Sequence, residues 1–178
     1  MAADELVEVI GADGGVQRVV TRAEIRRSRL RHRCTFVVVR SSDGGVLVHR
    51  RSDDKDLWPG RWDICAGGVA GAGEKWEAAA LRELREEVGV EATPGELEYL
   101  GEYDYADDDV DELARVWSIE HDGPYTFTDG EVVEARTVSL AGLTSMMAEM
   151  PFVPDSEALV LPLLLGNRGR DAADWSGA

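Results

Sequence analysis

The chain is short of basic residues, of cysteine and of long apolar runs, and each shortage excludes a class of protein. It has 19 lysines and arginines against 35 aspartates and glutamates, and its formal net charge at pH 7 is −16. A nucleic-acid-binding protein needs a basic surface for the phosphate backbone, so we expect no nucleic acid as a partner. No apolar run reaches the ~18 residues of a membrane helix, and the N-terminus lacks the features of a signal peptide. We therefore expect a cytoplasmic protein with no membrane partner.

The two cysteines, Cys34 and Cys65, both stand among apolar residues. This setting predicts buried, reduced thiols and no disulfide framework. The 178 residues suit one domain that buries roughly 70% of its unfolded surface. A composition of 44% hydrophobic and 30% charged residues is ordinary for a globular protein.

The basic residues that are present gather near the N-terminus. Between residues 22 and 51 the only acidic residues are Glu24 and Asp43. The arginines of this segment are Arg22, Arg26, Arg27, Arg29, Arg31, Arg33, Arg40, Arg50 and Arg51. Such a patch would steer anionic substrates, or it would complement acidic loops across a dimer interface, and both interpretations stay open.

A glycine-rich loop followed by strong helix formers is the most informative stretch. Residues 67–73 include four glycines, at 67, 68, 71 and 73, where the backbone can turn sharply or approach a ligand closely. From Lys75 to Val88 the residues are mostly Ala, Leu, Glu and Arg, and Gly89 follows at the place of a left-handed helix stop. The pattern predicts a helix that ends at Val88.

One face of this helix is acidic. Glu83, Glu86 and Glu87 stand at i, i+3 and i+4 and are therefore neighbours. Their repulsion costs the helix a few tenths of a kcal/mol, and Arg82 can pair with only one of them, Glu86. A solvated charged face is the simplest interpretation of a glutamate-rich helix. Beside a glycine loop with free carbonyls, however, these carboxylates supply the oxygens that a hard divalent cation requires.

The full pattern resembles the signature of a known family, the Nudix box. It reads Gly68, five residues, Glu74, seven residues, Arg82-Glu83-Leu84, one residue, Glu86-Glu87, one residue, Gly89-Val90. Every defining position is filled, and weaker similarity extends over roughly residues 30 to 165. The resemblance implies a Mg²⁺- or Mn²⁺-dependent hydrolase that uses metal-activated water to cleave a nucleoside diphosphate linked to another group, or a similar small diphosphate.

Helical spacing makes Glu83 and Glu87 the best pair to hold one cation, because residues at i and i+4 lie one above the other. Glu86 is adjacent and can hold a second cation or bridge two. The general base is not fixed by the box, since relatives differ, and we choose Glu83.

The resemblance assigns further roles around these glutamates. It implies that the carbonyl of Gly67 is a metal ligand, and that Glu74 and Arg82 form an ion pair that fixes the loop to the helix. Glu131 and Glu134, after the box, are both candidates for a further carboxylate that reaches the site.

Upstream of the box, the stretch from Leu47 to Asp63 resembles the Nudix branch that contains isopentenyl-diphosphate isomerase. Here Arg50, Arg51 and Lys55 are donors that a diphosphate could use. A solvated loop is an equally open interpretation of these residues.

Two other functions stay open as alternatives. The isomerase uses a Cys-Gly-His element at the start of the box, where this chain has Gly67, Gly68 and Val69. Cys65 is two residues early, some 6–7 Å along a strand, so it cannot replace the missing thiol. A non-enzymatic Nudix module that binds a ligand is the second alternative, although this box lacks none of its acidic residues.

The resemblance implies an α/β/α sandwich with a central mixed sheet. We expect a β-hairpin and a basic surface helix over residues 1–30 within the same domain, the Nudix domain over 31–165, and a loose polar tail over 166–178. Two β-prone runs, residues 32–40 and 46–50, predict a pair of adjacent strands. A homodimer is common in the family, and residues 1–30 could supply its interface.

Overall fold

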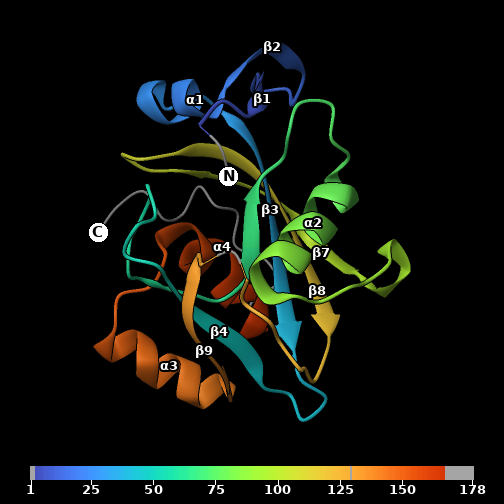
Figure 1. Ribbon diagram of the computed structural model, residues 1–178, viewed down its shortest axis with the longest axis vertical. Coiled ribbons are helices and arrows are strands. Elements are labelled where there is room, and N and C mark those ends of the chain that lie inside the picture. Colours follow the sequence, from blue (N-terminus) through green and yellow to red (C-terminus); the bar gives the residue numbers. More distant parts are fainter. Residues whose placement is uncertain (1–2, 129, 167–178) are drawn as a thin grey trace.

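The computed structural model describes residues 3–128 and 130–166, and a seven-stranded mixed sheet forms its centre (Figure 1). The strand order is β5-β4-β3-β8-β7, with β6 paired to β3 and β9 paired to β4. The strands are β3 (His32–Arg40), β4 (Val46–Arg51), β5 (Trp62–Asp63), β6 (Ala66–Val69), β7 (Glu98–Ala106), β8 (Asp111–Glu120) and β9 (Val132–Val138).

Helices cover both faces of the sheet, because alternate residues of the central strand β3 point to opposite sides. Val37 and Val39 pack with the apolar stripe of helix α2 (Trp76–Val88). Phe36 and Val38 belong to the other core, with α3 (Leu140–Glu149) and α4 (Pro154–Leu164). The predicted α/β/α sandwich with a mixed sheet is confirmed. A short 3₁₀ turn, η1 (Pro94–Glu96), follows α2.

The N-terminal residues form the predicted hairpin and helix. Strands β1 (Leu6–Ile10) and β2 (Val16–Thr21) pair antiparallel, and helix α1 (Arg22–Ser28) follows at once. The Thr21 hydroxyl accepts a hydrogen bond from the Glu24 N–H at 3.2 Å and so caps the start of this helix. In Figure 1 this unit stands above the sheet, next to the loop that joins β6 to α2.

Strand β1 holds that loop directly. The Ala72 N–H donates to the Leu6 carbonyl at 2.9 Å, the Gly73 N–H donates to Glu8 Oε1 at 2.9 Å, and Val7 bridges to Gly71. The hairpin therefore supports the glycine-rich loop from above.

The two runs are neighbouring strands in the sheet, as expected, but the pairing between them is short. Strands β3 and β4 meet at one position, Arg40 opposite Val46. The partners of β3 are instead β8, in parallel, from His32 opposite Glu112 to Arg40 opposite Glu120, and β6, antiparallel. Strand β4 pairs along its length with β9. The short connection between residues 41 and 45 suggests a hairpin, but the two strands diverge because each gains a longer partner from elsewhere in the chain.

Other expectations concern the C-terminal part. Helix α4 continues through Pro162 and ends at Leu164, although an internal proline usually kinks or breaks a helix. Apart from Gly166, the predicted loose tail lies outside the described residues. Among the described residues no helix is both long and apolar enough to cross a membrane.

The homodimer stays a prediction.

Candidate active site

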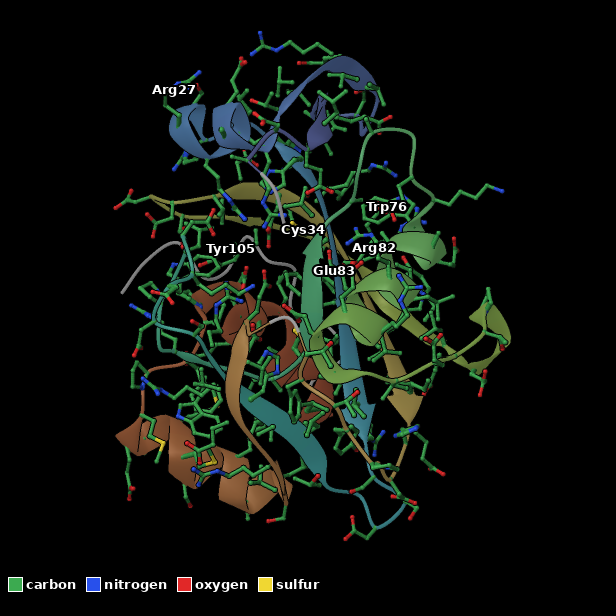
Figure 2. All side chains as sticks on the ribbon, in the orientation of Figure 1. Arg27, Cys34, Trp76, Arg82, Glu83 and Tyr105 are labelled. Atoms are coloured by element: carbon green, nitrogen blue, oxygen red, sulfur yellow. The ribbon has the colours of Figure 1, made fainter. Side chains whose placement is uncertain are left out.

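Helix α2 turns two of its glutamates inward. Ala80, Leu84 and Val88 are fully buried against the sheet and fix the orientation of the helix. Glu83 and Glu87 lie beside this stripe and are only 3% exposed each. Figure 2 shows Glu83 on the side of α2 that faces β3 and β6. The helix ends at Gly89, in the left-handed conformation (φ 71°), as the sequence predicts.

The two inward glutamates are hard to keep ionised without a cation. Burial, and then the charge of Glu83, raises the pKa of Glu87 to about 8. Burial also raises the pKa of Glu83. Glu87 Oε2 accepts a hydrogen bond from the Gly67 N–H at 3.0 Å, and Lys55 Nζ lies 3.7 Å from Glu87 Oε1. The pair of buried carboxyls therefore favours a positive charge between or beside them.

Two glycines of β6 permit close packing here, Gly68 against the Glu83 carboxylate and Gly67 against β3. A Cβ added at Gly68 would lie 2.6 Å from Glu83 Oε1, and one added at Gly67 would lie 2.3 Å from the Thr35 carbonyl oxygen. Both distances are too short for any other residue without displacement. The close approach of backbone that the glycine-rich loop predicts is thus present at these two positions.

Arg82 connects the loop to the helix. Its Nε and Nη2 donate to the two carboxylate oxygens of Glu74, each at 2.9 Å, and Nη2 also reaches the Val69 carbonyl at 3.2 Å. Its Nη1 donates to Glu83 Oε1 at 2.7 Å and to Glu86 Oε2 at 3.3 Å, so Arg82 pairs with two of the three glutamates and the expectation of Glu86 alone was wrong. Glu86 is 40% exposed and lies outside the residues that line the pocket.

The inward glutamates open onto a pocket with about 50 Å³ of free space. An ordered water needs roughly 10–15 Å³, so the space suits ions and a few waters. The expected residues that line the pocket are Gly67, Gly68, Glu83, Glu87, Arg51, Lys55 and Glu131.

Two residues that the sequence grouped with these lie elsewhere. Arg50 donates to the Gly60 carbonyl at 3.1 Å and to Asp53 at 2.9 Å, away from the pocket. Glu134 is exposed and pairs with Arg136. Glu131, by contrast, pairs with Lys55 at the pocket wall. A strand alternates its side chains, which separates Arg50 from Arg51.

Several residues of the pocket are absent from our sequence-based set. Those with ionisable side chains are Arg22, Arg26, Cys34, Asp63, Glu112 and Asp155. Asp155 stands in the first turn of α4, where an acidic residue is ordinary and gives no special signal. Burial, followed by the charge of Glu112, raises its pKa well above the usual range. The others come from α1, β3, β5 and β8, and only the sheet order brings them together.

The donor set at the glutamate pair consists of carboxylate oxygens and backbone groups. Hard divalent cations such as Mg²⁺ and Mn²⁺ prefer these ligands. The carboxylates of Glu83 and Glu87, one helical turn apart, supply the negative charge that balances such a cation. The residues present therefore fit such an ion.

Comparisons with known proteins agree with this geometry. Residues 30–159 match the family model of the NUDIX domain. A relative described as the uncharacterized Nudix hydrolase YfcD of Salmonella typhi is 33% identical over 178 residues, which covers 97% of this chain and 92% of the relative.

Two solved structures show the same fold. The crystal structure of DR0079 from Deinococcus radiodurans has a TM-score of 0.72 at 22% identity and covers 93% of this chain and 100% of that one. The NUDIX domain of Shewanella oneidensis NrtR, solved in complex with ADP ribose, has a TM-score of 0.62 at 19% identity and covers 84% of this chain and 99% of its own. The chain described here belongs to the Nudix family.

Proposed function

We propose that the protein hydrolyses the diphosphate bond of a nucleoside diphosphate linked to another group, or of a similar small diphosphate, with Mg²⁺ or Mn²⁺ as cofactor. One observation supports this most directly: the buried pair Glu83 and Glu87 lies against glycine backbone, with the Gly67 N–H donating to Glu87 at 3.0 Å and Gly68 next to the Glu83 carboxylate. Family membership as a Nudix protein supports the same class of reaction.

A diphosphate resists hydrolysis because its own negative charge repels nucleophiles, so a catalyst must neutralise its oxygens. A divalent ion, when bound, supplies that neutralisation and lowers the pKa of water. Glu83 and Glu87, together with the Gly67 carbonyl, would hold it, and Glu86 would serve a second ion near the rim.

The remaining residues would position the substrate and move the proton. Arg51 and Lys55 lie in the pocket wall and can donate hydrogen bonds to phosphate oxygens. Glu83 is the proposed general base: Arg82 holds its Oε1, and Oε2 would accept the proton of the attacking water. The Arg82–Glu74 pair keeps the loop and the helix in one arrangement while this happens.

The test is a panel of diphosphate compounds incubated with Mg²⁺ or Mn²⁺ and assayed by chromatography for the two phosphate-bearing products of hydrolysis. It contains nucleoside triphosphates, dinucleotides, nucleotide sugars, coenzyme A, isoprenyl diphosphates and ADP-ribose, the last because a structural neighbour was solved with it. We expect turnover of at least one compound, reduced about a hundredfold or more in Glu87→Gln. Glu77→Gln, on the exposed side of the same helix, is the control and should retain full activity.

Other outcomes would redirect the assignment. Tight binding without turnover across the panel would favour a ligand-binding module. Double-bond migration in an isoprenyl diphosphate without phosphate release would favour an isomerase.

A further inference from the structure

A second group of metal-ligand side chains lies near the glutamate pair. His32 and Cys34 stand two apart on β3, so they share a face of the sheet, and Glu112 lies opposite His32 on the parallel neighbour β8. A ring nitrogen of His32, the Cys34 sulfur and a carboxylate oxygen of Glu112 all lie within 4.8 Å of one another. The three residues are 1%, 4% and 2% exposed. In the described part of the chain, no other three His, Cys, Asp or Glu residues meet that distance.

Two atoms of this group are buried acceptors without a donor. His32 Nδ1 lies 2.8 Å from the Leu30 carbonyl oxygen. A carbonyl can only accept, so Nδ1 carries the ring proton and Nε2 keeps a free lone pair. Within the described residues, neither His32 Nε2 nor Glu112 Oε1 has a hydrogen-bond partner. Burial lowers the pKa of His32 to about 4, so the ring is neutral at pH 7 and able to ligate.

Arg26 does not supply the missing partner of the Glu112 carboxyl. Arg26, on α1, lies close enough to Glu112 to influence its charge. Its ion pair, however, is with Asp56 at 3.6 Å, and its own Nε has no hydrogen-bond partner in the described chain. The buried carboxyl of Glu112 is therefore left without a direct cationic partner by the neighbouring side chains that the structure describes.

We propose that His32, Cys34 and Glu112 bind a zinc-type transition-metal ion, at a site separate from the Mg²⁺ or Mn²⁺ site of Glu83 and Glu87. Zinc binds nitrogen, sulfur and oxygen at about 2.0–2.3 Å, which places tetrahedral ligands about 3.5 Å apart. The ligand chemistry separates the two sites, because a thiolate and an imidazole select zinc or cobalt over magnesium.

The charges also balance. Binding releases the Cys34 thiol proton to solvent, and the thiolate, the Glu112 carboxylate and the neutral imidazole together carry two negative charges. A divalent ion brings the sum to zero, which suits a buried site. Three protein ligands leave a fourth position open, as in zinc sites that bind water or substrate. Cys34 and Glu112 line the pocket that Glu83 and Glu87 also line, so this position is accessible to an oxygen of water or of a bound anion.

The experiment uses the full chain, freed of metal with a chelator and titrated with Co²⁺ as a spectroscopic substitute for Zn²⁺. We expect a near-ultraviolet thiolate-to-cobalt band that saturates at one equivalent and disappears when Zn²⁺ is added. Cys34→Ser should abolish the band. Cys65→Ser is the matched control, because Cys65 is equally buried but its sulfur contacts Asp63 instead, and this variant should keep the band.

Two further measurements separate this site from the proposed Mg²⁺ site. The band should persist in millimolar Mg²⁺ and in Glu87→Gln, and Glu112→Gln should weaken Co²⁺ binding about tenfold or more. The wild-type titration decides the matter even if Cys34→Ser fails to fold. The proposal is overturned if the wild-type protein shows no thiolate band at stoichiometric Co²⁺, or if Cys65→Ser removes the band. None of these readouts depends on hydrolytic activity.

Discussion

Arg82 and Glu74 meet as a two-pronged ion pair, with Nε–Oε1 and Nη2–Oε2 distances of 2.9 Å each. Glu74 Oε2 also accepts from the Gly71 N–H at 2.8 Å. Burial opposes the charge of Glu74, but the hydrogen bonds from Arg82 and Gly71 outweigh it and lower its pKa. This pair is the main side-chain connection between the glycine-rich loop and the helix that carries the inward glutamates.

Arg82→Lys should therefore lower activity strongly, although the substitution keeps the positive charge. Lysine offers a single point charge and cannot form the fork. We expect kcat to fall about 10–100-fold, because the loop and Glu83 lose their fixed geometry, and the free energy of unfolding to fall by about 1–3 kcal/mol. Arg85→Lys, on the exposed side of the helix, is the control for both kinetics and urea unfolding. Equal effects of the two changes would refute the positioning role.

Gly67→Ala and Gly68→Ala should separate stability from function. The added methyl at position 67 meets the backbone carbonyl of Thr35 and cannot be relieved cheaply, so the midpoint of thermal unfolding should fall markedly. At position 68 it meets only the end of the Glu83 side chain, which can move, so activity should fall while stability changes little. Gly95→Ala, with open space around it, is the control for both measurements. The opposite pattern would contradict the described geometry.

The metal-free protein should lose stability as the pH rises. The pKa of Glu87 is raised from 4.5 to about 8 in the folded state, so the folded chain binds this proton more tightly than the unfolded chain. The stabilisation is complete below about pH 4.5 and is lost as the pH rises to about 8. Thermal unfolding in EDTA between pH 5.5 and 8.5 measures this, and Glu87→Gln should flatten the decline relative to Glu77→Gln. An identical slope in the two variants would contradict it.

Mn²⁺ should stabilise the wild-type protein through the glutamate pair. An ion at a hundred times its dissociation constant contributes about 2.7 kcal/mol, which raises the melting temperature by roughly 5–10 °C for a chain of this size. Glu83→Gln should lose most of this increase, and Glu77→Gln should keep it. If Glu83→Gln responds like the wild type, then Glu83 is not a ligand.

Glu131 and Glu134 provide a matched pair on one segment. Glu131 contacts Lys55 in the pocket wall, whereas Glu134 is exposed and pairs with Arg136. We expect Glu131→Gln to lower kcat/KM severalfold and Glu134→Gln to leave it unchanged. Steady-state kinetics with the substrate found in the panel measures both, and a larger effect of Glu134→Gln would exclude Glu131 from the site.

Local patterns gave reliable predictions where neighbours in sequence determine the structure. The helix stop at Gly89 follows from a single residue and occurs as expected. The cap at Thr21 is equally local, because it needs one hydroxyl at the start of α1. The inward position of Glu83 and Glu87 follows from helical spacing once Leu84 and Val88 are buried.

Local patterns do not predict which strands pair when they lie far apart in the sequence. Nothing near His32 indicates that Glu112 will lie opposite it, because that contact requires the parallel pairing of two strands 80 positions apart. The same applies to Asp155, whose burial depends on how α4 packs against the sheet. The residues of α2 and its glycine-rich loop were therefore predictable from sequence, together with Arg51, Lys55 and Glu131, whereas those on α1, β3, β5, β8 and α4 were not.

The attachment of Leu6 and Glu8 to the glycine-rich loop affects how the protein can be shortened. A fragment cut to residues 30–159, the part that the family shares, would lose the two hydrogen bonds that hold Ala72 and Gly73, together with Arg22 and Arg26. Its loop would be free to move away from the glutamates even if the sheet formed normally. The smallest functional fragment is therefore longer than the segment that matches the family model. For the same reason, removing the first thirty residues to test for a homodimer would also disturb the site.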